Sequence, residues 1–203
     1  METRRAELEA IIRADPDLMR SLRLMRELAL PQARLVAGAI YQTVWNLICG
    51  LPRGTGMKDL DLIYFDADLS YEAEDRVIRE VAAASADFRL PVEIRNQARV
   101  HLWYGRRFGG HYPQLASADQ SLTLYAATAH AVGARLEPDD SIDIIAPFGL
   151  DDIFEMVLRR NPALPATQSY AEKARRAKAI WPRLEVLGSE CSAQSDRSTH
   201  SDR

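Results

Sequence analysis

Apolar residues recur at helical spacing near the start of the chain, and this pattern predicts two helices there. The first covers residues 2–13 and the second covers residues 17–30, where leucine and methionine side chains form one stripe. Either Asp15 or Asp17 can cap the start of the second helix, because a carboxylate there accepts hydrogen bonds from the first free amides. Pro31 ends the second helix, since proline cannot donate the next backbone hydrogen bond.

The rest of the chain alternates between short apolar runs, typical of strands, and longer segments with helical periodicity. The expected strands are residues 34–37, 59–65, 90–95 and 141–146. The expected helices are residues 39–49, 70–84, 119–127, 150–159 and 170–180. Residues 51–58 contain one proline and two glycines and are expected to form a loop, whereas residues 99–104 fit either a helix or an extended segment.

We expect one main domain with appendages, because 203 residues are about the length of one and a half average domains. The expected boundaries are residues 1–30 for N-terminal helices, 31–160 for the main domain and 161–188 for a C-terminal helical segment. Residues 189–203 are rich in serine and nearly devoid of apolar side chains, so they are expected to be a disordered tail.

Composition excludes several classes of protein. The chain has no apolar run near the length that spans a bilayer, and its N-terminus lacks the apolar core of a secretory signal. Its two cysteines, Cys49 and Cys191, suit neither a disulfide framework nor a zinc site, so a cytoplasmic location is expected. The net charge of −3 argues against general coating of nucleic acid, and acids and bases are concentrated in separate segments.

The clearest candidate for chemistry is a pair of aspartates in the expected strand of residues 59–65. Asp59 and Asp61 are two positions apart, so their side chains point to the same face of the strand. Two neighbouring carboxylates repel each other unless a cation lies between them or one is protonated. Because oxygen ligands favour hard divalent cations, the pair suits Mg²⁺ or Mn²⁺, although such a pair also occurs on solvated strand ends.

Three further features favour a functional site over a solvated strand end. Lys58 directly precedes the pair, in a chain with only three lysines. Gly38 follows a short apolar run and opens a helix, whose free backbone amides can hold phosphate. Glu93 is a lone acid on the next expected strand, which could lie beside the aspartates.

A small-residue turn into a helix, followed by an Asp-x-Asp strand and a third acid on a later strand, resembles the polymerase-beta-type nucleotidyltransferase superfamily. Within it, the chain is similar to a bacterial family of nucleotidyltransferase-like proteins over roughly residues 10–185. The segments that carry this resemblance are VAGAIYQTVWNLICGLP, KDLDLIYFD, VEIRNQARVHLWY, TAHAVGARL and APFGLDDIFEMVLRRNP. The resemblance implies an α+β fold with a mixed β-sheet flanked by helices.

The resemblance also implies an activity, the transfer of a nucleoside monophosphate from a nucleoside triphosphate to a hydroxyl acceptor. By this resemblance Asp59, Asp61 and Glu93 would bind Mg²⁺ or Mn²⁺ and act in catalysis. The implied partners are the nucleoside triphosphate and an acceptor, with nucleic acid only in the acceptor role and no membrane.

The triphosphate would lie at Gly38, Ala39 and Lys58 by the same resemblance. Ala39 stands where the superfamily has Gly or Ser, which removes a hydroxyl contact, and the third acid is Glu93 where Asp is usual. These departures leave open a second interpretation, a non-catalytic nucleotide-binding or regulatory protein on the same fold.

A third interpretation rests on residues 62–70, which resemble the first motif of haloacid-dehalogenase-type phosphatases. In that case Asp66 would be the nucleophile and Asp68 the acid and base. Its metal partners would be either Asp139 and Asp140 or Asp151 and Asp152. The lysine that such enzymes use is hard to assign, because Lys173 and Lys178 lie in an amphipathic segment.

Four other residues have two possible roles each. Arg95 and Arg99 could hold phosphate or an acceptor, or form a solvated basic edge. His101 could be a general base, but a structural hydrogen-bonded role is favoured. Trp45 is expected to anchor the core rather than to stack on a nucleotide base.

Overall fold

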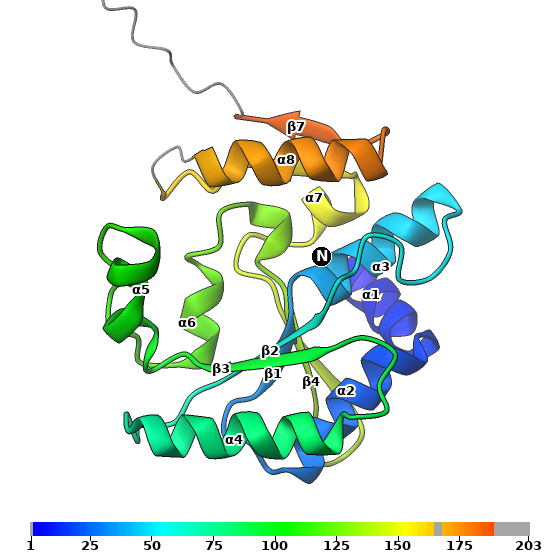
Figure 1. The fold of residues 1–203 in the computed structure, drawn as a ribbon. Coiled ribbons are helices and arrows are strands. Elements are labelled where there is room, and N and C mark those ends of the chain that lie inside the picture. Colours follow the sequence, from blue (N-terminus) through cyan, green and yellow to red (C-terminus); the bar gives the residue numbers. More distant parts are fainter. Residues whose placement is uncertain (1, 165–167, 189–203) are drawn as a thin grey trace, which may run out of the picture.

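A five-stranded mixed sheet forms the centre of the computed structural model, which describes residues 2–164 and 168–188 (Figure 1). Its strands are β1 Arg34–Val36, β2 Leu60–Tyr64, β3 Val92–Asn96, β4 Gly133–Leu136 and β5 Ile142–Ile145. They lie in the order β3-β2-β1-β4-β5. Strands β2 and β3 run parallel, whereas the other neighbours are antiparallel.

Helices surround this sheet, and a second, two-stranded sheet lies beside the last helix (Figure 1). The helices are α1 Glu2–Ala14, α2 Pro16–Glu27, α3 Gly38–Cys49, α4 Tyr71–Ala84, α5 Val100–Phe108, α6 Ala118–Leu122, the 3-10 helix η1 Thr128–His130, α7 Asp151–Phe154 and α8 Gln168–Ile180. The second sheet pairs β6 Val157–Arg159 with β7 Glu185–Leu187 in parallel. None of the helices in the described part of the chain is long and apolar enough to cross a membrane.

One hydrophobic core connects the N-terminal helices, the sheet and the C-terminal segment. It extends from Leu8 in α1 to Leu184 beyond α8, with Trp45 of α3 fully buried between them. The Trp45 indole donates a hydrogen bond of 2.9 Å to the carbonyl of Ile153, so its polar edge is satisfied. This confirms the expectation that Trp45 anchors the core.

The local signals account for the helix ends where they are strongest. Asp15, rather than Asp17, caps α2, because its carboxylate accepts hydrogen bonds from the amides of Asp17 and Leu18 at 2.9 and 3.2 Å. Ser70 caps α4 in the same way, accepting from the amide of Ala73 at 3.3 Å. The undecided segment 99–104 forms the helix α5.

Several expected elements differ in the structure. The helix expected over residues 150–159 stops after one turn, and the chain continues through Met156, at a φ of 55°, into β6. The helix expected over 119–127 is only the short α6. The segment 161–188, expected to be helical, also supplies β7. Strand β4 was not predicted, because Gly133 interrupts its apolar pattern; a side chain there would lie 3.2 Å from Arg34 Cδ.

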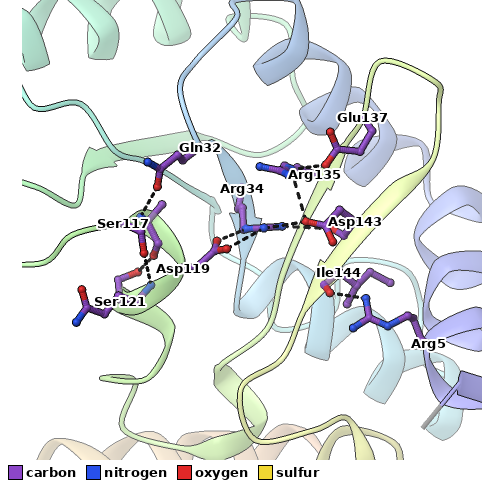
Figure 2. Close-up of polar contacts among 12 residues, drawn as sticks. Arg5, Gln32, Arg34, Ser117, Asp119, Ser121, Arg135, Glu137, Asp143 and Ile144 are labelled. Carbon is purple, nitrogen blue, oxygen red and sulfur yellow. Dashed lines mark hydrogen bonds and ion pairs between the residues drawn. The ribbon is translucent and has the colours of Figure 1, made fainter.

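A buried guanidinium joins the sheet to α6 (Figure 2). The Arg34 side chain, only 3% exposed, donates two hydrogen bonds to Asp119 of α6 and one of 2.8 Å to Asp143 of β5. Arg135 of β4 lies 3.5 Å from the same Asp143 carboxylate. Because Asp119 and Asp143 face one central cation, the position of α6 depends on Arg34.

We predict that Arg34→Met lowers the free energy of unfolding by about 3 kcal/mol, because two carboxylates then lose their shared counter-charge. Denaturant unfolding measures the change, and Arg79→Met is the matched control. Arg79 pairs with Asp75 on the exposed face of α4, so its loss should cost less than about 0.5 kcal/mol. Equal effects of the two substitutions would contradict the role assigned to Arg34.

Candidate active site

The three predicted acids lie on one face of two neighbouring strands. In the parallel pair β2–β3, Asp61 stands directly beside Glu93, and Asp59 precedes Asp61 by two residues. Side chains in register on neighbouring strands point to the same side of the sheet. Leu60 and Leu62 take the opposite face and are almost fully buried. The strand alternation therefore keeps the acids outside the core.

These acids form part of one cavity of about 970 Å³. Five of the six residues proposed for the site line it, namely Gly38, Lys58, Asp59, Asp61 and Glu93. The sixth, Ala39, is not part of the lining, because its side chain is 1% exposed and packs in the core. The structure thus brings the Asp-x-Asp strand, the lone glutamate and the start of α3 to a single space.

The electrostatics of this space favour a bound cation. The cavity walls limit the hydration of Asp61, and with the charges of Asp59 and Glu93 they raise its pKa to about 6. Limited hydration and the charge of Glu93 also raise the pKa of Asp59. Glu93 has one cationic neighbour, Arg95, at 3.7 Å. Carboxylates that repel one another in this way are stabilised by positive charge placed between them.

The donor set is chemically suited to a hard divalent cation, because all three candidate ligands are carboxylates. Within the described residues, no three His, Cys, Asp or Glu side chains already converge as a metal-binding group. Glu93 has a half-exposed side chain that lies near Arg95. To bind the same cation as Asp61, this side chain would have to turn away from Arg95.

The turn into α3 contains a strained residue that sequence reasoning missed. The positive φ lies at Ala37, with φ 51° and ψ −115°, and not at Gly38. Helix α3 begins without any side-chain cap, so its first amides are left for another acceptor beside the cavity. The backbone of Ala37 is held in place by Val132, whose carbonyl accepts its amide at 2.9 Å. An apolar strand that runs directly into a helix is the signal that indicates such a turn.

We predict that Ala37→Gly raises the free energy of unfolding by about 1 kcal/mol, because glycine adopts this backbone conformation without steric cost. The matched control is Ala39→Gly, which should lower it by about 1 kcal/mol, since Ala39 has ordinary helical geometry. Thermal or urea unfolding gives both values. A loss of stability in Ala37→Gly would show that the turn is not strained.

The wall opposite the acids comes from segments that the sequence did not assign to the site. Lys173 and Arg176 of α8 line the cavity. The charge of Lys173 interacts with that of Asp61, and the charge of Arg176 acts on the Tyr41 hydroxyl. Their spacing of three residues places them on one face of the helix. The sequence assigned α8 only as an amphipathic helix, because nothing local shows which element it faces.

A third wall is aromatic. Tyr104 and Phe108 of α5 lie with ring centroids 5.2 Å apart, and Tyr112 lies 4.8 Å from Tyr104. All three line the cavity together with Tyr125, whose pKa is raised by burial and by Asp61. The cavity is therefore acidic at the sheet, basic at α8 and aromatic at α5.

His130 lies at the back of the cavity as a neutral side chain. Its ring stacks on Tyr41, with centroids 4.6 Å apart and planes 17° from parallel. Burial lowers the pKa of His130 to about 3, and the charge of Lys173 acts in the same direction. The imidazole is thus an uncharged group that packs on Tyr41 at neutral pH.

We predict that His130 makes the protein less stable as the pH falls below about 6.5. Between that pH and about 3, the unfolded chain binds a proton at this position and the folded chain does not. The free energy of unfolding should fall by up to about 1.4 kcal/mol per pH unit from this group. His130→Gln should flatten the slope, whereas His111→Gln, an exposed site, should leave it unchanged. Parallel slopes in all three proteins would refute the prediction.

The aspartates of the phosphatase interpretation have local structural roles. The Asp66 carboxylate accepts the amide of Asp68, and the Asp68 carboxylate accepts the amide of Ser70, both at 2.9 Å. Asn96 binds the backbone of Asp66 and holds this turn against β3. Neither carboxylate lines the cavity.

The other acids of that interpretation are likewise held by neighbours. Asp139 accepts from Ser141, Asp140 pairs with Arg26, and Asp152 pairs with Arg159. Asp151 lies 4.0 Å from Arg4. Each pair stabilises a loop or helix end far along the chain from Asp66.

Of the remaining sequence candidates, only Arg95 belongs to the cavity. Arg99 instead donates to the carboxylate of Glu74 and to the carbonyl of Leu69, so it ties α4 to the start of α5. His101 is half-buried and does not line the cavity, and its Nδ1 has no hydrogen-bond partner. Arg99 and His101 therefore act away from the acids.

Comparison with known proteins agrees with this geometry. A family model described as nucleotidyltransferase matches residues 23–186, so the chain belongs to this nucleotidyltransferase family. A protein whose NMR structure reveals a CCA-adding enzyme head domain superposes with a TM-score of 0.71 at 26% identity. That match covers 89% of this chain and 94% of the other. The resemblance noted in the sequence and the predicted nucleotidyltransferase-type fold are confirmed.

Larger enzymes share the fold alone. The Thermotoga maritima CCA-adding enzyme complexed with tRNA matches with a TM-score of 0.51 at 19% identity. A tRNA-processing enzyme with CTP matches with a TM-score of 0.50 at 16% identity. The aligned region covers 89% and 82% of this chain, but only 42% of each of these two enzymes. No curated protein matches the chain at a significant level.

Proposed function

We propose that this protein moves a nucleoside monophosphate from a nucleoside triphosphate to a hydroxyl acceptor, with Mg²⁺ or Mn²⁺ as its cofactor. The observation that carries the proposal is the register of β2 and β3, which sets Asp61 beside Glu93 in the same cavity as Asp59 and the uncapped start of α3. Membership of the nucleotidyltransferase family supports the same reaction class.

Each part of the cavity has a role in this reaction. Asp59 and Asp61 would hold the divalent cation, and Glu93 would complete its ligands after turning from Arg95. The first amides of α3, at Gly38 and Ala39, would donate hydrogen bonds to the phosphate chain, because helix N-termini bind anions. When bound, the cation would neutralise charge on the triphosphate and on the leaving pyrophosphate.

The chemical step is a single displacement at phosphorus. The acceptor oxygen forms a bond to the α-phosphorus, and the bond from that phosphorus to the bridging oxygen breaks. Pyrophosphate leaves with the electron pair of the broken bond. The proton of the acceptor hydroxyl passes to a carboxylate of Asp59 or Asp61 or to solvent. Because the acceptor oxygen attacks the α-phosphorus directly, the protein forms no covalent intermediate.

Nucleic acid is the first acceptor to test. Two structures with this fold are tRNA enzymes. The chain is negatively charged overall, but Arg95, Arg160 and Arg176 line the cavity. A panel of tRNA and hydroxylated metabolites therefore suits the assay, with each of the four nucleoside triphosphates as donor.

We predict that the protein binds a nucleoside triphosphate with Mg²⁺ and that Asp59→Asn with Asp61→Asn weakens this binding at least tenfold. Removal of both charges leaves the cation without its main ligands. Calorimetric titration with ATP, CTP, GTP and UTP measures the effect. Asp68→Asn is the matched control, because amide and carboxylate oxygens form the same turn, and it should bind as the unaltered protein does. If the protein binds none of the four nucleotides, the proposed function is refuted.

The second candidate is a non-catalytic nucleotide-binding protein. The departures from the superfamily pattern at Ala39 and Glu93 favour it. Pyrophosphate release with the acceptor panel separates the two functions, since a binding protein would hold nucleotide and release none. Release of phosphate from phosphomonoesters, abolished by Asp66→Asn, would instead support the phosphatase interpretation.

A further inference from the structure

Helix α8 faces the acidic strands across the cavity and presents two cations to it. Lys173 and Arg176 line the same cavity as Asp61, and the charge of Asp61 acts on the Lys173 ammonium. Both side chains are accessible to solvent within that space. Within residues 2–164 and 168–188, neither forms an ion pair or a hydrogen bond.

Of the cations on α8, it is Lys173 and Arg176 that line the cavity. Arg175, on the same helix, does not line the cavity, and Lys178 donates to the carbonyl of Leu184. Lys173 and Arg176 are three residues apart, so they form one charged face. Limited hydration inside the cavity and the charge of Arg176 both lower the pKa of Lys173.

The helix is fixed at both ends, so these cations cannot simply move away. At its start, the Tyr170 hydroxyl contacts the carbonyls of Leu158 and Leu187 at 2.8 and 2.7 Å. Just beyond its end, the Trp181 indole donates to Asn46 of α3 at 2.9 Å and packs edge-on against Trp45. The two anchors connect α8 to β6, β7 and α3. In Figure 1, α8 lies above α7.

The same anchor connects α8 to the loop that leads into the aspartates. Gly56 has a φ of 81°, and a side chain there would lie 2.6 Å from the Trp181 ring. The loop therefore packs directly on Trp181, three residues before Asp59. This contact joins the end of α8 to the loop that precedes β2.

We propose that Lys173 and Arg176 are phosphate-binding residues, which hold the triphosphate of the incoming nucleotide from the side opposite to Asp59 and Asp61. This inference rests on the proposed function for the presence of a nucleotide in the cavity. The chemistry is that of an anion between cations: ammonium and guanidinium groups donate charge-assisted hydrogen bonds to phosphate oxygens. Their charge compensates the part of the triphosphate that a divalent cation at the carboxylates does not reach.

The test is binding of nucleotide and of inorganic tripolyphosphate, each with Mg²⁺, to the full chain. Lys173→Met and Arg176→Met should each weaken both ligands about tenfold, the loss of one charge-assisted hydrogen bond. The affinity for the corresponding nucleoside, which has no phosphate, should stay unchanged. Arg175→Met is the matched control on the same helix and should bind every ligand as the unaltered protein does.

The outcomes separate this inference from the proposed function. If the unaltered protein binds no nucleotide, the proposed function fails. If it binds nucleotide, and Lys173→Met and Arg176→Met bind it equally well, the role of α8 is refuted. Equal losses for nucleoside and triphosphate would also refute it, because they would reflect altered packing rather than lost phosphate contacts. Thermal unfolding of each variant shows that the fold is retained, and Lys173→Arg should restore binding of tripolyphosphate.

Discussion

The parallel pairing of β2 with β3 is the constraint on which the candidate site depends. It sets Asp61 beside Glu93 residue for residue, and a shift of one position would turn Glu93 into the opposite face of the sheet. That opposite face is filled by Leu60, Leu62 and Ile94, all almost completely buried. The core therefore fixes the register, because a charged side chain could not replace an apolar one there without a large cost. Packing on one face determines the chemistry on the other.

The remaining walls are positioned by contacts between segments that are distant in the sequence. Arg34 holds α6 near the sheet through Asp119, and the segment that follows α6 carries Tyr125 into the cavity. Trp181 joins α8 to α3 and to the loop that contains Gly56. These contacts are tertiary, and they combine polar groups on buried side chains with ring packing. The walls of the cavity are thus positioned by contacts between segments that are far apart in the sequence.

This division explains what the sequence could and could not predict. Strand alternation placed Asp59 and Asp61 on one face, because the period of a strand is a local property. For Glu93 the sequence indicated only that the next strand could lie beside them, and the pairing itself comes from the structure. Sequence also located the uncapped helix start, although it emphasised Gly38 where the strain lies at Ala37. Lys173, Arg176 and Tyr125 were not assigned to the site, since an amphipathic helix or a lone tyrosine carries no local sign of the element it faces. Strand β6 was mistaken for helix because a few apolar residues fit both periods.

The arrangement of charge explains why the acidic side chains of the sheet and the basic side chains of α8 line one cavity here without forming an ion pair. Asp61 and Lys173 influence one another across the cavity, yet no ion pair links them in the described part of the chain. Hydrogen bonds of Tyr170 and Trp181 anchor α8 near its two ends. A space with carboxylates on one side and cations on the other is complementary to a ligand that carries both signs. A divalent cation bound to a triphosphate is such a ligand, because its metal would meet the acids while its outer phosphate oxygens meet the helix. The unpaired charges are then explained as complementary to the substrate rather than as a defect of packing.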